Sequence, residues 1–158
     1  MASFGIVIPA HNEEDRIQIC LQSLAPFQNA KDPIIVIDAS SNDRTTNIAE
    51  SCGVQVLSSQ LKSRGLAVAM GVNELVNHSS NYTAIIVAHA DMIFHPDSRS
   101  ILVHTLKTES HCSGGAFGHR IQAPEWWFRI IERGNNFRAH WLQMPYGDQA
   151  QFFRPHLL

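Results

Sequence analysis

The sequence predicts an α/β protein with a mostly parallel sheet covered by helices on both faces. Four short runs of mainly β-branched residues alternate with segments of helical spacing, and repeated strand–helix units form parallel sheets. The second run ends in Asp38, and the fourth leads into His89-Ala90-Asp91. Both places are at the carboxyl ends of strands, where ligands of such sheets bind. With 158 residues, 44% of them hydrophobic, the chain is long enough for one domain with a core.

The strands and helices follow from local patterns. An apolar run stopped by Pro9 predicts the first strand, and Ile17, Leu21 and Leu24 share one face of the helix after it. Turn residues at 40–43 precede the next helix, for which Asp43 is the expected N-cap. The predicted strands cover residues 4–8, 33–38, 54–57, 84–87 and, near a ligand, 114–121, and the other predicted helices cover 48–52, 65–76, 97–108 and 124–142.

Composition excludes several classes of protein. A formal net charge of −2 and a pI near 6.5 give no basic field for nucleic acid. Cys20, Cys52 and Cys112 form no Cys-x-x-Cys pair, so we expect free cysteines in a reducing compartment. The apolar stretch at the N-terminus is too short for a signal peptide, and no segment predicts a transmembrane helix. The expected location is the cytoplasm, with association at a membrane surface as the alternative.

Carboxylates at two strand ends are the main candidates for chemistry. Asp38 has the position to accept hydrogen bonds from a base or a ribose, although an aspartate there also caps turns. Asp91 suits a divalent cation that neutralises a diphosphate, because Mg²⁺ and Mn²⁺ prefer oxygen ligands. His89 is open to three interpretations: a further ligand, a ribose contact or an ordinary polar residue.

Basic and aromatic residues give weaker signals. Lys62 and Arg64 precede Gly65 at a predicted helix N-terminus, where phosphates bind, but a solvated loop explains them equally well. Trp126 and Trp127 suit stacking on a sugar, and packing in a core or an interface is the competing interpretation.

Together these segments resemble glycosyltransferase family 2. Residues 6–14 are similar to that family's first strand with its Pro-x-x-Asn-Glu signature, and residues 35–45 to its Val-Asp-x-x-Ser-x-Asp-x-Thr motif. Arg64-Gly65 with Gly71 resembles the third element, and His89-Ala90-Asp91 stands in place of Asp-x-Asp. Residues 114–117, 132–138 and 145–149 resemble a subgroup that carries His-Ala-Asp and Pro-Tyr-Gly-Asp-Gln.

The resemblance implies a GT-A fold, which is Rossmann-like, and metal-dependent transfer of a sugar from a nucleoside-diphosphate sugar to an unidentified acceptor with inversion. Asp91 would hold Mg²⁺ or Mn²⁺, with His89 as a further candidate ligand. The implied nucleotide-sugar-binding residues are Pro9, His11, Glu13, Asp38, Ser40, Arg64, Gly65, His89, Ala90 and Asp91. The implied acceptor region contains Gly114, Gly115, Tyr146, Asp148 and Gln149.

Family members continue past Gly-Asp-Gln to a Glu-Asp pair whose aspartate is the expected base, and this chain has residues 154–158 there instead. We therefore expect one domain over 1–158, with a nucleotide-sugar-binding part at about 1–110 and the truncated start of an acceptor-binding part at about 111–158. Asp148 is the only candidate base. The alternatives are a non-catalytic nucleotide-sugar-binding remnant, one piece of a split enzyme and a nucleotidyltransferase. The last is disfavoured, because a nucleotidyltransferase would ordinarily have a glycine-rich basic loop directly after the first strand, and this sequence has none there. A homo-oligomer is expected if the domain exposes apolar surface.

Overall fold

The computed structural model describes residues 2–79, 81–118, 121, 125–141 and 149–155. The strands are β1 (Phe4–Ala10), β2 (Ile34–Asp38), β3 (Gln55–Ser58), β4 (Ala84–Val87), β5 (Gly114–Ala116) and β6 (Gln151–Phe153). The helices are α1 (Ile17–Ser23), α2 (Ala25–Gln28), α3 (Thr45–Ser51), α4 (Arg64–His78), α5 (Ser98–Thr108) and α6 (Trp126–Trp141).

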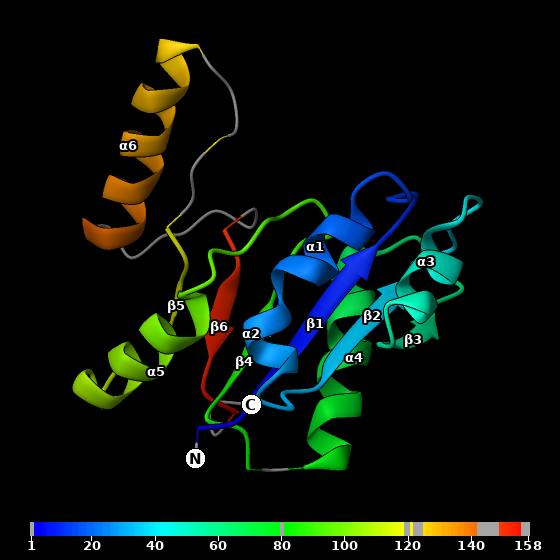
Figure 1. Cartoon of the computed structure of the whole chain (residues 1–158). Helices are drawn as coiled ribbons and strands as arrows, with labels where there is room; N and C mark the ends of the chain where they lie inside the picture. Colours follow the sequence, from blue (N-terminus) through cyan, green and yellow to red (C-terminus); the bar gives the residue numbers. More distant parts are fainter. Residues whose placement is uncertain (1, 80, 119–120, 122–124, 142–148, 156–158) are drawn as a thin grey trace.

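The six strands form one sheet in the order β3-β2-β1-β4-β6-β5 (Figure 1). Strands β1 to β4 are parallel, which confirms the predicted α/β class. Strand β6 runs antiparallel to both β4 and β5. It was not predicted, because its three residues are too few to show an alternating pattern.

The sequence predicted that Pro9 stops the first strand. In the structure, strand β1 continues to Ala10. The Val7 carbonyl accepts a hydrogen bond from Ala88 on the β4 side, so the polar backbone groups of Pro9, two residues on, face the same side. Strand β4 ends at Val87, and its pairing with β1 ends at Val7. The missing N–H of Pro9 therefore costs no ladder bond, and proline is tolerated there.

The core has one layer on each face of the sheet (Figure 1). On one face, α1, α2, α3 and α5 bury Ile6 and Ile8 of β1; on the other, α4 covers Val7 and Ile37. Gly71 lets α4 come close, because a Cβ at this position would lie 2.4 Å from Val7 Cγ1. Gly71, which the sequence analysis grouped with a family motif, thus has a packing role.

Helix α6 stands apart from these layers (Figure 1). A helix was predicted over residues 124–142, and the structure confirms it. Trp126 and Trp127 are exposed and contact each other edge to face, so neither packs in the core. No helix in the described part of the chain is both long and apolar enough to cross a membrane.

Candidate functional site

The candidate site lies where the strand order reverses. The chain passes from β1 to β2 on one side, whereas β4 pairs with β1 on the other side. The carboxyl ends of β1 and β4 therefore border a switch point, the usual ligand position in open α/β sheets. His11 and Glu13 follow β1, and His89 and Asp91 follow β4.

The loops after β1 and β2 are hydrogen-bonded to each other. Asn12 adopts a left-handed conformation with φ of 55°, which asparagine tolerates better than most residues. Its N–H donates to Ser41 Oγ at 2.9 Å, and its side-chain oxygen accepts from the Asn42 N–H at 2.9 Å. Asn12 therefore fixes the loop that carries two site candidates.

Acidic residues extend this connection. The Glu13 N–H donates to Thr45 Oγ1 at 2.8 Å, and the Glu14 N–H donates to Asp43 Oδ2 at 3.2 Å. Desolvation raises the pKa of Asp43, but hydrogen bonds from the Thr45 side chain and from backbone N–H groups outweigh it, so the pKa lies below its ordinary value. Asp43 was expected to be the N-cap of α3, but the N-cap residue is Arg44. Asp43, one position before the N-cap, accepts a hydrogen bond from the Thr45 N–H.

Asp38, at the end of β2, is buried and already has a structural partner. Both of its carboxylate oxygens accept from the Ser41 N–H, at 3.2 and 3.3 Å. Ser40 has φ of 61° and donates from Oγ to the Ser59 carbonyl at 2.9 Å. The turn-capping interpretation of Asp38 is therefore confirmed, and its role toward a ligand stays a prediction.

Arg64 begins α4 and reaches the β4 loop. Ser63 is the N-cap residue, and its side chain accepts from the Leu66 N–H. An Arg64 Nη2 atom contacts His89 Nε2. A basic side chain at a helix N-terminus is thus joined to the His-Ala-Asp segment, 25 positions later in the sequence. Gly65 follows in open space, since a Cβ there would meet nothing within 4 Å.

The His89-Ala90-Asp91 segment is held by a hydrogen bond from helix α1. The Cys20 thiol donates to the His89 carbonyl with an Sγ–O distance of 3.3 Å. Burial, followed by the charge of Asp91, raises the pKa of Cys20 to about 12, so the sulfur keeps its proton at neutral pH. Ala90 is buried. Cys20 is therefore a buried free cysteine that also holds the backbone of this segment.

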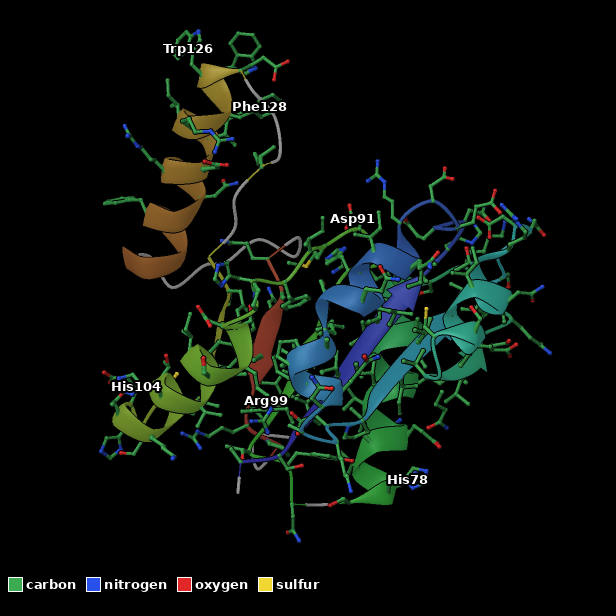
Figure 2. The ribbon with its side chains drawn as sticks, viewed as in Figure 1. His78, Asp91, Arg99, His104, Trp126 and Phe128 are labelled. Carbon is green, nitrogen blue, oxygen red and sulfur yellow. The ribbon has the colours of Figure 1, made fainter. Side chains whose placement is uncertain are left out.

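Asp91 is half-exposed above α1 (Figure 2). Its carboxylate lies 3.5 Å from Arg16 Nη1. Desolvation, followed by the negative charge of Asp91, raises the pKa of Glu13, while Arg16 and His89 lower it. The site thus combines two mutually repelling carboxylates with two cationic side chains, Arg16 and Arg64.

A divalent cation fits this donor set only in an open form. Among the described residues, no three His, Cys, Asp or Glu side chains come together as a metal site. Mg²⁺ is commonly held by one or two carboxylates together with phosphate oxygens of the substrate. Asp91 is the accessible carboxylate here, so the remaining ligands would come from a bound diphosphate and water.

The glycines of β5 make room for another strand. A Cβ on Gly114 would lie 2.6 Å from the Phe152 carbonyl oxygen, and one on Gly115 would lie 2.8 Å from the Phe152 ring. The segment that lies close to these two glycines is therefore β6, and the predicted place of this strand near a ligand stays a prediction. Gln149, just before β6, is fully buried. Tyr146 and Asp148 lie outside the described residues.

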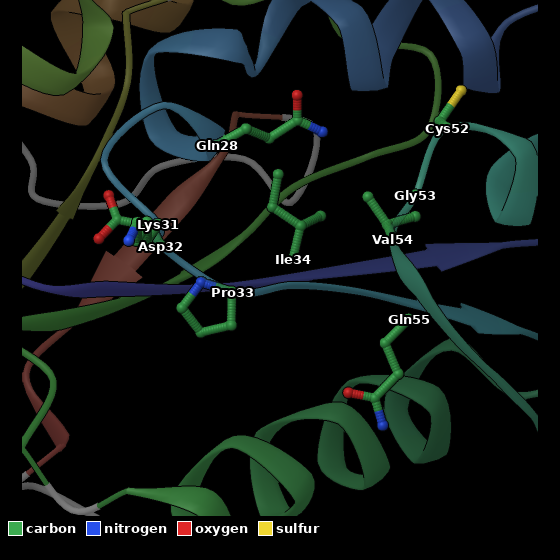
Figure 3. A pocket seen from close by; sticks show the side chains of 9 residues that line it. All are labelled: Gln28, Lys31, Asp32, Pro33, Ile34, Cys52, Gly53, Val54 and Gln55. Atoms are coloured by element: carbon green, nitrogen blue, oxygen red, sulfur yellow. The ribbon is translucent and has the colours of Figure 1, made fainter.

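A depression of about 400 Å³ lies at the opposite edge of the sheet (Figure 3). It is bordered by the residues that begin β2 and β3, including Ile34 and Gln55. Asp32, which lines it, accepts hydrogen bonds from Arg99 Nε at 2.7 Å and from the Phe4 N–H at 3.0 Å. This depression is separate from the candidate site and brings none of the candidate residues together.

The sequence model of the family described as glycosyl transferase family 2 matches residues 5–157. The chain belongs to glycosyl transferase family 2. Its fold is similar to that of glucosyl-3-phosphoglycerate synthase from Mycobacterium tuberculosis, solved with Mn²⁺, uridine diphosphate and phosphoglyceric acid. The TM-score is 0.70 at 22% identity, over 99% of this chain and 57% of that one.

Two other proteins are also similar to this chain, one in fold and one in part of its sequence. The structure of residues 1–349 of S. aureus TarS gives a TM-score of 0.69 at 16% identity, over 99% of this chain and 48% of that one. A 4,4'-diaponeurosporenoate glycosyltransferase of Staphylococcus haemolyticus is 44% identical over 54 residues, which are 34% of this chain and 14% of that protein. The chain thus spans only about half the length of its structural relatives.

Within the family match, several contacts were not predicted from sequence. Arg16 was missed because it lies between the Asn-Glu signature and α1, where an exposed arginine carries no special signal. The bond between Cys20 and His89 spans 69 positions. Only the parallel register of β1 and β4, which sets the β4 loop above α1, brings such residues together.

Proposed function

We propose that this chain binds a nucleoside-diphosphate sugar with a divalent cation and acts in sugar transfer to an acceptor with inversion. The contact between Arg64 and His89, beside Asp91, is the observation that carries the proposal. It joins the N-terminus of a 15-residue helix to the loop after β4. Helix N-termini and arginine side chains both bind phosphate, so a diphosphate suits this position.

Each part of the site has a distinct role in this proposal. Asp38 and Ser40 lie at the end of β2, where a carboxylate would accept hydrogen bonds from the base or ribose of the nucleotide. Arg64 would stabilise the negative charge on the departing diphosphate. A cation held at Asp91 would neutralise part of the same charge.

Inversion requires a base within hydrogen-bond reach of the acceptor hydroxyl. Asp148 is the candidate within this chain. We propose that residues from 111 onward contribute to acceptor binding, among them Gly114, Gly115, Tyr146 and Gln149. M. tuberculosis glucosyl-3-phosphoglycerate synthase was solved with Mn²⁺ and uridine-diphosphate-glucose, which supports a uridine nucleotide as the first ligand to test.

The test is calorimetric titration of uridine and guanosine diphosphate with Mn²⁺, Mg²⁺ or EDTA. We expect binding that weakens in EDTA, and Asp91→Asn should remove the metal-dependent part while thermal unfolding stays cooperative. Asp38→Ala should weaken binding by about 1–3 kcal/mol, the usual cost of removing one hydrogen-bonding partner and leaving the other unsatisfied. Equal affinity with and without metal would exclude the cation from the proposal.

Transfer itself is tested by nucleoside diphosphate release from candidate donors and acceptor extracts. We expect Asp148→Asn to lower turnover on the order of 10²–10⁴-fold, the usual cost of losing a general base. Turnover that Asp148→Asn leaves unchanged would exclude Asp148 as the base.

A further inference from the structure

Helix α6 presents its polar side to the chain and its apolar side to solvent. Glu132 is buried and accepts a hydrogen bond from the Ile121 N–H. Arg129 donates to the Ile121 carbonyl at 2.6 Å and pairs with Glu132 at 3.1 Å. The polar residues therefore attach the helix to the segment after β5.

The outward side is an apolar arc. At about 100° per residue, Trp126, Ile130, Trp127 and Ile131 fall within roughly 140° of the helix circumference. These four side chains are 69%, 57%, 48% and 46% exposed, respectively. Trp126 lies at the end of α6 farthest from the sheet (Figure 2). A helix in a water-soluble fold ordinarily buries such an arc, and a contiguous exposed one marks an interaction surface.

The charge on α6 identifies the kind of partner. The helix contains Arg129, Arg133 and Arg138 against Glu132, a net charge of +2, whereas the chain as a whole has −2 and the remainder therefore −4. Arg133 is exposed about 20° before the arc begins, and the sequence position of Arg138 falls inside the arc, about 20° from its other end. Two copies of α6 meeting face to face would bring these like charges together, whereas anionic lipid headgroups would neutralise them.

We propose that α6 lies in the surface of an anionic lipid bilayer, with the arc of Trp126, Trp127, Ile130 and Ile131 in the acyl boundary and Arg133 at the headgroups. Amphipathic helices with tryptophan on one side and arginine at the polar border bind membranes in this orientation.

The test uses the tryptophans as reporters, because all three, Trp126, Trp127 and Trp141, belong to α6. The chain is titrated with vesicles of phosphatidylcholine alone and of phosphatidylcholine with about one third phosphatidylglycerol. We expect a blue shift of fluorescence and co-sedimentation with the anionic vesicles, both reduced by salt. Ile130→Ser should weaken partitioning about tenfold, since burial of such a side chain contributes about 1.5 kcal/mol or more.

Ile101 on α5 is the matched control, because it is as exposed as Ile130, at 57%. Ile101→Ser should leave partitioning unchanged, and Arg133→Gln should weaken it about fivefold on anionic vesicles only, since each basic residue near the surface contributes about 1 kcal/mol. Circular dichroism and thermal unfolding verify that the variants fold. Absence of vesicle binding, equal losses in Ile130→Ser and Ile101→Ser, or equal binding to neutral vesicles would overturn the proposal. So would a lipid-independent blue shift with dimers in sedimentation velocity, which would assign the arc to a second copy.

Discussion

Arg16 and a divalent cation would compete for the same carboxylate, so removal of Arg16 should tighten cation binding. Arg16 Nη1 lies 3.5 Å from Asp91 Oδ2, and the two side chains are 65% and 46% exposed. If Asp91 is the cation ligand, Arg16→Gln releases its carboxylate and removes a positive charge that repels the incoming ion.

The magnitude follows from the exposure of the pair. Two unit charges about 4 Å apart in water interact by about 1 kcal/mol, and measured exposed ion pairs contribute about 0.2–1 kcal/mol. We therefore expect Arg16→Gln to tighten Mn²⁺ binding up to about fivefold at low salt. The gain should shrink as ionic strength rises, because both charges are accessible to screening ions.

Electron paramagnetic resonance of free Mn²⁺, recorded with uridine diphosphate present, measures this affinity directly. Arg44→Gln is the matched control, since Arg44 is exposed, pairs with Glu14 at 3.1 Å and changes the net charge equally. It should have little effect, and Asp91→Asn should abolish the site. Unchanged or weaker Mn²⁺ binding in Arg16→Gln, or an equal gain in Arg44→Gln, would refute the competition.

Three further predictions concern packing and protonation. Gly71→Ala places a Cβ 2.4 Å from Val7 Cγ1 and should destabilise the fold by about 1–3 kcal/mol in urea unfolding, whereas Gly65→Ala in the same helix meets nothing within 4 Å and should not destabilise it. Cys20, with a pKa of about 12, should be alkylated at pH 8 about a thousandfold more slowly than an ordinary exposed thiol, as mass spectrometry of labelled peptides would measure; comparable rates would contradict its burial. The raised pKa of Glu13 means that its ionisation opposes folding, a cost absent below the unfolded pKa and complete above the folded one. Glu13→Gln should therefore raise the melting temperature at pH 7 but not near pH 3, and an equal shift at both pH values would exclude this cause.

Much of the fold could be predicted because its central strands have unambiguous patterns. The five residues of β2 are all buried, and a short run of Ile and Val bounded by Pro33 and Asp38 favours such a strand. The predicted end of β1 was wrong, because a strand tolerates a proline at position 9 only where the neighbouring β4 no longer pairs with it. The sequence predicted helix α6, but a local pattern carries no information on what the apolar residues of the helix face.

The site was predictable where strand ends carry it and less so where loops meet. Asp38 and Asp91 were identified because Asp38 ends the buried strand β2 and Asp91 comes shortly after the buried strand β4. The partners that hold them, Ser41 and Arg16, contribute through loop conformation. Such contacts depend on distances between segments far apart in sequence, which no local pattern records.

The antiparallel strand β6 has a consequence for how this family can vary. The Phe117 N–H donates to the Ala150 carbonyl at 2.9 Å, and β5 is paired with β6 just beside this bond. The chain from 118 to 149 therefore leaves and re-enters the sheet at adjacent points, so the sheet itself closes this loop. An insertion, a deletion or a graft from a relative between these two points leaves the register of β4, β6 and β5 unchanged. A longer loop adds only a slowly growing entropic cost. The length and surface of the chain between these two points can therefore change while the strand order of the sheet stays the same.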